Sequence, residues 1–203
     1  MLRCLYDQDC NIFEVSASIY MKTLVTEKIL VYKVRTKRDP DAFSKLYDFY
    51  IEPIYRFVYF KLSNKEDSED ITSEVFLKAW NYLISEEKEV NNFRQLIYRI
   101  ARNRVIDVYR ERAKKSECSI ETIEIAATDN IIHSIELAEE KVELINTIKK
   151  LKHEYQEVIH LRYVEGLSVR DIAVILDKKY ANVRVILHRA IKKLKELSVR
   201  TPN

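Results

Sequence analysis

The sequence is poor in the residues that interrupt helices. Among 203 residues there is one glycine and there are three prolines, well below ordinary usage. β-Hairpins and tight α/β loops rely on these residues for their turns, so their scarcity argues against both. Charged residues make up 33% and hydrophobic residues 47% of the chain, which is typical of a folded chain and not of a disordered one. The composition therefore predicts an all-α protein.

Cysteines and long apolar runs are also scarce. Cys4, Cys10 and Cys118 are odd in number and show no CxxC or CxxH spacing, so they indicate neither a disulfide framework nor a zinc site. No apolar run approaches the ~18 residues of a membrane span, and the N-terminus lacks the apolar stretch of a signal peptide. The four histidines show no pairing typical of a nucleophile or a metal site. We expect a cytoplasmic protein with no membrane insertion, metal, cofactor or catalytic residue.

Charge is segregated along the chain, although the net charge is only +3. Residues 116–140 contain seven acidic residues and no lysine or arginine, and helical patterns lie on both sides of them. We therefore expect two small helical domains, residues 27–115 and 141–199, joined by an acidic linker at 116–140. Residues 1–26 form an N-terminal extension. Residues 1–20 show no sustained helical period and are expected to be poorly packed, the alternative being an extension that covers the first domain or binds a regulator.

The C-terminal domain carries the pattern of a helix-turn-helix. The only glycine, Gly166, follows a helical stretch at Leu151–Val164 and suits a left-handed helix C-cap. Ser168 and Asp171 form a capping box that begins a second helix. Asn182 is the predicted N-cap of a third helix.

The two faces of this third helix differ in character. Its predicted inward face is apolar: Val183, Leu187, Ala190, Ile191, Leu194 and Leu197. Its predicted outward face is largely cationic: Arg184, Val185, His188, Arg189, Lys192, Lys193 and Lys195. Such a helix suits the major groove of DNA. On this pattern alone, the alternative is the solvated basic face of an ordinary small bundle.

A second amphipathic basic helix is predicted at residues 93–110. Between Arg94 and Lys115 there are eight basic and two acidic residues. At 100° per residue, four polar side chains fall within an arc of about 100° opposite the apolar face: Arg99, Arg102, Asn103 and Arg110. Charge alone leaves two interpretations open, phosphate contact or a solvated surface.

Three segments in this order resemble the extracytoplasmic-function (ECF) sigma factors of the sigma-70 family. They are DSEDITSEVFLKAW at 67–80, FRQLIYRIARNRVIDVYR at 93–110, and EGLSVRDIAVIL at 165–176 followed by VRVILHRAIKKLKEL at 183–197. The resemblance extends from about Glu27 to Leu197, and three ordered motifs are more specific than any one of them. It implies a transcription initiation factor in which residues 27–115 are sigma region 2 and residues 141–199 are region 4.

The resemblance implies a docking surface for core RNA polymerase on the first of these segments. Asp70, Ser73 and Glu74 would face the clamp helices of the largest polymerase subunit, where opposite charges favour fast and oriented association. Ser73 stands where family members often carry glutamine.

Region 2 would also capture a flipped base of the melted minus-10 element, between a loop at about 86–92 and the basic helix. Asn103 matches the family's pocket asparagine, and Arg99, Arg102 and Arg110 would hold the backbone of the single strand. Leu96 replaces a common tryptophan, and Phe93 and Tyr98 are the aromatic residues nearby.

Region 4 would read the minus-35 element as duplex, through Asn182, Arg184, Val185, His188 and Arg189. The sequence departs from the family in the turn at 177–182, which lacks the usual glycine and proline, and at Ile186, where arginine is common. The resemblance further implies promoter DNA, duplex and melted, and an anti-sigma factor as partners.

One alternative from another class is a stand-alone helix-turn-helix regulator that never touches polymerase. Such a protein has no reason to carry the motifs at 67–80 and 93–110. An enzyme of helical fold would need a cluster of carboxylates or histidines, which the spacing does not offer.

Overall fold

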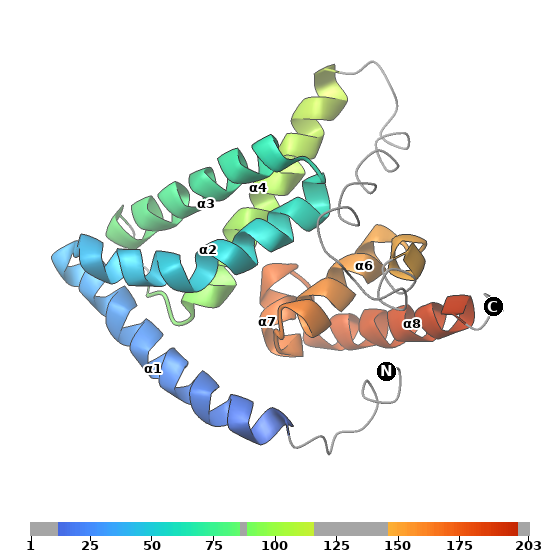
Figure 1. Ribbon diagram of the computed structural model, residues 1–203, viewed down its shortest axis with the longest axis horizontal. Helices are drawn as coiled ribbons and strands as arrows, with labels where there is room; N and C mark the ends of the chain where they lie inside the picture. The colour runs from blue at the N-terminus through green and yellow to red at the C-terminus, as the bar shows by residue number, and fades with distance from the viewer. Residues whose placement is uncertain (1–11, 86–88, 116–145, 199–203) are drawn as a thin grey trace. The chain divides into compact units, whose positions relative to one another are not determined.

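The computed structural model describes residues 12–85, 89–115 and 146–198, and these residues are arranged in helices (Figure 1). The elements are α1 (Ile12–Lys37), α2 (Pro40–Leu62), α3 (Lys65–Ser85), α4 (Phe93–Lys115), α6 (His153–Ile159), the π-helical turn η4 (His160–Val164), α7 (Val169–Ile175) and α8 (Tyr180–Ser198). No strand occurs among the described residues, which confirms the all-α prediction. The predicted acidic linker lies outside the described residues.

The chain forms two compact units. Among the described residues, the first unit contains those up to Phe49 and those between Trp80 and Phe93, and the second contains Tyr50–Ala79 and those from Arg94 onward. In the first unit the ring of Phe43 meets that of Trp80 edge to face, with centroids 5.1 Å apart, a geometry that aromatic pairs prefer. The second unit contains the C-terminal half of α2, most of α3 and α4, and the C-terminal helices.

The beginnings of the first helices follow from their capping residues. Asp39 accepts hydrogen bonds from the backbone N–H groups of Asp41 and Ala42 at 3.0 and 3.1 Å, and Pro40 occupies the first helical position, where its missing N–H costs nothing. The side chain of Asn64 accepts from the N–H of Asp67 at 2.9 Å at the start of α3. The connection between α2 and α3 is therefore limited to Ser63 and Asn64.

The start of α4 is capped from a distant helix. Glu27 of α1 is buried, and its carboxylate accepts a hydrogen bond from the N–H of Phe93 at 3.0 Å. A carboxylate at this position also complements the positive end of the helix dipole. This contact ties the beginning of the basic helix to α1.

The N-terminal extension differs from expectation. We predicted no helical period in residues 1–20, but α1 begins at Ile12. Helices can form on neighbouring helical residues without a clear apolar face of their own, because propagation is easier than nucleation. The described side chains begin at Val25, so poor packing of the extension stays a prediction.

The C-terminal helices form the predicted helix-turn-helix. Gly166 has a φ of +63°, and the side chains of Ser168 and Asp171 make both hydrogen bonds of a capping box at the start of α7. Ile172, Ala173 and Leu176 are buried. The helix α8 contacts both α6 and α7.

The turn between α7 and α8 is closed without glycine. Asp177 takes a φ of +52°, and the N–H of Lys178 donates to the carbonyl of Ala173 at 2.9 Å. This is the hydrogen bond of a helix end whose last residue is left-handed, a place usually taken by glycine or asparagine. Aspartate is among the few other residues that tolerate this conformation.

The predicted N-cap of α8 is wrong. The helix begins at Tyr180, and the N–H groups of Asn182 and Val183 donate to the carbonyl of Lys179 at 2.9 and 3.2 Å. Asn182 therefore lies inside the first turn. Because Asp177 is left-handed, the next helix begins after only two further residues, Lys178 and Lys179. The preference of asparagine for N-cap positions does not reveal this early start.

Candidate nucleic-acid interface

The helix α8 presents a basic side opposite its packed side. Val183, Ala190 and Leu194 are buried against the neighbouring helices. The five predicted minus-35 residues are all exposed: Asn182, Arg184, Val185, His188 and Arg189. The guanidinium carbon of Arg184 lies 5.9 Å from the ring centroid of Tyr180, a cation–π contact that can hold this arginine near the start of the helix. The helix therefore offers cations and polar groups where a recognition helix contacts base edges.

The helix α4 also presents polar residues to solvent. Arg99, Asn103 and Arg110 are exposed. Arg102, the fourth predicted residue, is half-buried and its Nε lies 3.3 Å from the Oε1 of Glu157. Three of the four predicted side chains are thus accessible together, while the fourth is held by an acid of the C-terminal helices.

The aromatic residues near Leu96 cannot stack on a base in this conformation. Phe93 and Tyr98 are 1% and 0% exposed, and Leu96 is buried too. Tyr98 packs edge to face on Phe57, with ring centroids 5.6 Å apart. Both rings pack in the interior and are not available to support single-stranded DNA in this conformation. Residues 86–88 of the predicted loop lie outside the described residues, so the pocket for a flipped base stays a prediction.

The helix α3 carries the predicted docking residues on one side. Asp70 and Ser73 are exposed and Glu74 is half-buried. Leu77, which the motif did not single out, is 61% exposed. At 100° per residue these four side chains fall within an arc of about 100°. An exposed leucine in line with the acids could have been recognised from its i, i+3, i+4, i+7 spacing.

Glu74 is linked to the basic helix. The guanidinium of Arg104 on α4 donates to both of its carboxylate oxygens, and this interaction lowers the pKa of Glu74 despite the opposing effect of burial. Arg112 of α4 forms an ion pair with Asp67 of α3 in the same way. Sequence reasoning missed both pairs because they join residues 30 or more positions apart.

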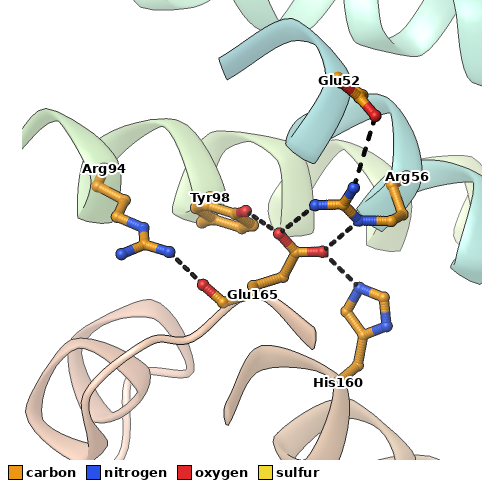
Figure 2. Close-up of polar contacts among 6 residues, drawn as sticks. All are labelled: Glu52, Arg56, Arg94, Tyr98, His160 and Glu165. Atoms are coloured by element: carbon orange, nitrogen blue, oxygen red, sulfur yellow. Dashed lines mark hydrogen bonds and ion pairs between the residues drawn. The ribbon is translucent and has the colours of Figure 1, made fainter. Parts of the chain in front are cut away.

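The structure also reveals a buried carboxylate cluster that no motif indicated, shown in Figure 2. The side chain of Glu165 is 2% exposed. It accepts hydrogen bonds from Arg56 Nε at 3.0 Å, from Arg56 Nη2 at 3.3 Å and from the hydroxyl of Tyr98 at 2.6 Å. Arg94 donates to the backbone carbonyl of Glu165. His160 Nε2 lies 3.2 Å from Oε1 of Glu165 without hydrogen-bond geometry.

Burial and hydrogen bonding act in opposite directions on this cluster. Burial alone would raise the pKa of Glu165, but the contacts from His160, Arg56 and Tyr98 lower it to about 2. Burial lowers the pKa of His160 below its ordinary value, against the attraction of the neighbouring carboxylate. At neutral pH we therefore expect a charged glutamate beside a neutral histidine.

Comparison with known proteins identifies the family. The sigma-70 region 2 family matches residues 46–115, and the sigma-70 region 4 family matches residues 141–194. SigW of Bacillus subtilis, an ECF RNA polymerase sigma factor, is 32% identical over 190 residues, covering 87% of this chain and 97% of SigW. The chain belongs to the ECF sigma factors. Its function is therefore that of an RNA polymerase sigma factor, and a stand-alone regulator is not favoured.

Other relatives agree with this membership. BldN of Streptomyces coelicolor, also an ECF sigma factor, is 28% identical over 165 residues, covering 78% of this sigma factor and 61% of BldN. Two solved structures share the fold, each with a TM-score of 0.63. CnrH in complex with the cytosolic domain of CnrY is 21% identical and covers 87% of this chain and 99% of that one. The Bartonella quintana sigma factor RpoE in complex with the anti-sigma factor NepR is 20% identical and covers 79% and 98%.

Within the described residues, no three His, Cys, Asp or Glu side chains are grouped so that they could hold a metal ion. No helix in the described part of the chain has both the length and the apolar character needed to cross a membrane.

Proposed function

We propose that this sigma factor docks on core polymerase through α3, captures the melted minus-10 element with α4 and reads the minus-35 duplex with α8. Residues 27–115 act as region 2, residues 141–199 as region 4, and residues 116–140 as the connection between them. The observation that carries this proposal is the exposure of Asp70 and Ser73 on α3, of Arg99 and Asn103 on α4, and of the cationic side of α8. The protein acts in the cytoplasm, and the polymerase supplies all of the chemistry.

The docking surface combines charge with an apolar contact. Asp70 and Glu74 give α3 a negative side, which suits a basic coiled coil and favours oriented association. Leu77, at 61% exposure, adds apolar area that polymerase would cover, and burial of a leucine stabilises by roughly 1.5–3 kcal/mol. Ser73 offers a hydroxyl, although this hydroxyl donates to the carbonyl of Glu69 at 3.0 Å.

The minus-10 assignment depends on the amide of Asn103. Its side chain carries paired donor and acceptor groups, which can read the edge of a base that has left the stack. Arg99 and Arg110 are exposed on the same side of α4 and can hold phosphates. Arg102 can also bind phosphate once its ion pair with Glu157 is broken.

The minus-35 assignment depends on the first turns of α8. Arg184, His188 and Arg189 can donate to base edges or phosphates, and Val185 offers an apolar contact to a thymine methyl group. Ile186 is half-buried, so the position where arginine is common in the family contributes to packing here.

An anti-sigma factor is the proposed regulatory partner. The Bartonella quintana neighbour is a sigma factor solved with its anti-sigma factor, and the present chain has the same fold. A partner of this kind is the simplest way for a cell to keep the exposed surfaces of α3 and α8 away from polymerase and DNA.

Transcription in vitro with core polymerase tests the proposal. We expect the purified protein to direct initiation from defined start sites whose upstream sequences share elements near minus 10 and minus 35. Band-shift measurements with the same promoters provide the control. Tight binding of the free protein to duplex promoter, with no transcription upon addition of core enzyme, would instead indicate a stand-alone regulator.

A further inference from the structure

The exposed side of α1 carries an apolar stripe. Val25, Ile29 and Tyr32 are 57%, 52% and 63% exposed, which places them among the most exposed large apolar side chains of the described residues. Their spacing of four and three residues aligns them along one side of the helix, and Thr36, also exposed, continues the line. The opposite side of the same helix, which includes Val34, is buried. The stripe is therefore not the face through which α1 packs.

Cations flank this stripe on both sides. At about 100° per residue, Lys28 lies roughly 60° to one side of Val25 and Lys33 roughly 80° to the other. Both lysines are exposed, as is Lys37 one turn after Lys33. Between Val25 and Lys37 the only acidic residue is Glu27, which is buried and caps α4. This side of α1 therefore combines apolar side chains with positive charge and carries no exposed acid of its own.

The patch does not suit a protein partner. A stable protein interface buries about 800 Å² on each side, which is more than three partly exposed side chains provide. A coiled coil needs its apolar seam over several heptads, but a strict heptad continues from Val25 to Lys22 and Ser18. Pairing of two copies of α1 would also bring Lys28 and Lys33 close to like charges. A partner helix is therefore a poor occupant of this surface.

Nucleic acid is a poor occupant as well. Phosphates favour cations throughout a contact surface, whereas the centre of this one is formed by Val25, Ile29 and Tyr32. The exposed cations lie beside these apolar side chains and not among them. The occupant must therefore offer negative charge together with an apolar layer.

An anionic membrane surface offers both. Interfacial helices bury an apolar stripe at the level of the headgroups and carry lysine or arginine beside it. Tyrosine favours this level because its ring is apolar and its hydroxyl is polar. Lysine stems lie along apolar surface while their ammonium groups reach outward to charge. Because lipids adapt to the shape of the protein, a small patch is sufficient.

We propose that the exposed side of α1, formed by Val25, Lys28, Ile29, Tyr32 and Lys33, binds the surface of an anionic phospholipid membrane. The helix lies along the surface, and its opposite side stays packed in the protein. Binding is reversible, because a few apolar side chains and lysines contribute no more than a single lipid anchor. The membrane then holds a pool of the sigma factor that exchanges with the free protein.

Flotation of the full chain with lipid vesicles tests the proposal. We expect the protein to float with phosphatidylcholine vesicles that contain about 30% phosphatidylglycerol and not with pure phosphatidylcholine, since each cation near an anionic surface strengthens binding about 5-fold. Raising the salt from ~0.1 M to ~1 M shortens the Debye length from about 10 to about 3 Å and should release the protein. No flotation, or equal flotation with both lipids, would overturn the proposal.

Charge reversal distinguishes this patch from the basic side of α8. We expect Lys28→Glu with Lys33→Glu to weaken binding to the anionic vesicles at least ~25-fold, a factor of about 5 for each cation lost. Lys192→Glu with Lys195→Glu is the matched control, because it changes the net charge equally at exposed positions of α8. It should weaken binding less than about 5-fold. Equal losses in the two variants would show adsorption by net charge and would overturn the assignment to α1.

The apolar stripe is tested by Ile29→Ser with Tyr32→Ser. We expect a loss of at least ~10-fold in vesicle binding, since both side chains enter the lipid. Val164→Ser with Val174→Ser is the matched control, at two other exposed apolar positions, and should leave vesicle binding unchanged. Full binding without the stripe would mean that charge alone holds the protein, contrary to the proposal.

A fluorescent reporter shows whether the stripe enters the lipid. With the native cysteines replaced by serine, bimane is attached at Thr36→Cys in line with the stripe, or at Ser44→Cys on α2, both exposed positions. We expect anionic vesicles to shift the emission of the first to shorter wavelength and to leave the second unchanged. Equal behaviour of the two labels would overturn the proposed orientation of α1.

The same variants decide between membrane and nucleic acid. Weaker binding of Lys28→Glu with Lys33→Glu to DNA of unrelated sequence, in a protein that does not float with vesicles, would assign the patch to nucleic acid and overturn the proposal. The vesicle measurements contain neither polymerase nor promoter. Their outcome is therefore independent of the functions proposed for α3, α4 and α8.

Discussion

Arg104 of α4 donates through its guanidinium to both carboxylate oxygens of Glu74 on α3. The proposed polymerase-docking helix and the proposed promoter helix are therefore joined by an ion pair in which the arginine side chain is 15% exposed and the glutamate 43%. Glu74 thus joins α3 to α4 and is also one of the residues proposed to face polymerase. A test of docking is cleaner at Asp70, which is exposed on the same side of α3.

Reversal of charge at Asp70 tests the docking surface. We expect Asp70→Arg to weaken co-purification with core polymerase at least ~10-fold, because an acid facing a basic partner is replaced by a like charge. The free energy of unfolding should change by less than about 0.5 kcal/mol, as at other surface positions. Glu66→Arg, at an exposed position near the start of the same helix, is the control. Equal retention of polymerase by both variants would rule out this side of α3.

Substitutions in α4 and α8 separate melting from duplex recognition. We expect Asn103→Ala to impair opening at one minus-10 base and Arg184→Ala to weaken upstream duplex binding, because the two residues act at different DNA positions. Each lost contact to a base corresponds to about 1–3 kcal/mol. Permanganate footprints on duplex and pre-melted templates measure the difference, with Lys114→Ala as the control on α4. If Asn103→Ala were equally defective on pre-melted templates with any base at that position, the pocket would be excluded.

Acidification is expected to weaken the fold in two stages. The pKa of His160 is lowered by burial, so the unfolded chain binds a proton first and stability begins to fall below about pH 6.5. The pKa of Glu165 is lowered to about 2 from 4.5, so its contribution is present above about pH 4.5 and is lost as the pH falls toward 2. At 1.36 kcal/mol per pH unit, this second loss is at most about 3 kcal/mol.

Urea unfolding as a function of pH measures both stages. We expect His160→Phe to abolish the loss of stability that begins below about pH 6.5. Glu165→Gln should reduce the loss of stability between about pH 4.5 and 2. The control Glu154→Gln, which removes the carboxylate paired with Lys178, should show both losses. An unchanged pH profile in Glu165→Gln would show that this carboxylate is not linked to folding.

The turn before α8 gives a prediction on stability. Asp177 has a φ of +52°, and glycine adopts this conformation without the steric cost of a β-carbon. We expect Asp177→Gly to raise the free energy of unfolding by up to about 1 kcal/mol and Asp177→Ala to lower it. Thermal unfolding of the two variants distinguishes backbone strain from a loss of side-chain contacts, because the latter would destabilise both.

Removal of residues 1–20 tests the N-terminal extension. The described part of α1 begins to bury side chains at Glu27, Leu30 and Val31, downstream of the deletion. We expect the truncated protein to lose less than about 0.5 kcal/mol of stability and to keep its transcription activity. A larger loss in either measurement would mean that the extension packs on the first unit or contributes to function.

The helices and their faces were predictable because they depend on local patterns. Gly166 and the pair Ser168 and Asp171 act within a few residues of their position, and each has the predicted effect. The exposed sides of α4 and α8 follow from a period of 3.6 residues. The start of α8 was misplaced because Asp177 adopts the left-handed conformation that is usually given to glycine, and the helical residues from Ile12 of α1 were missed.

The contacts of Glu165 were beyond sequence reasoning. It lies 109 positions from Arg56 and 67 from Tyr98, and no local pattern relates such distant residues. The burial of Tyr98 likewise depends on Phe57 and Glu165, which lie far from it in the sequence. Pairing across the fold depends on tertiary structure, which a single sequence does not report.

Asp171 illustrates how two requirements can restrict one position. One of its carboxylate oxygens accepts from the N–H of Ser168 in the capping box at the start of α7, and the other accepts from the side-chain amide of Gln95. Glutamate could satisfy the first requirement, as it does in other capping boxes, and leucine could satisfy neither. In a saturation library we therefore expect Asp171 to tolerate fewer replacements than the neighbouring Arg170, which is exposed.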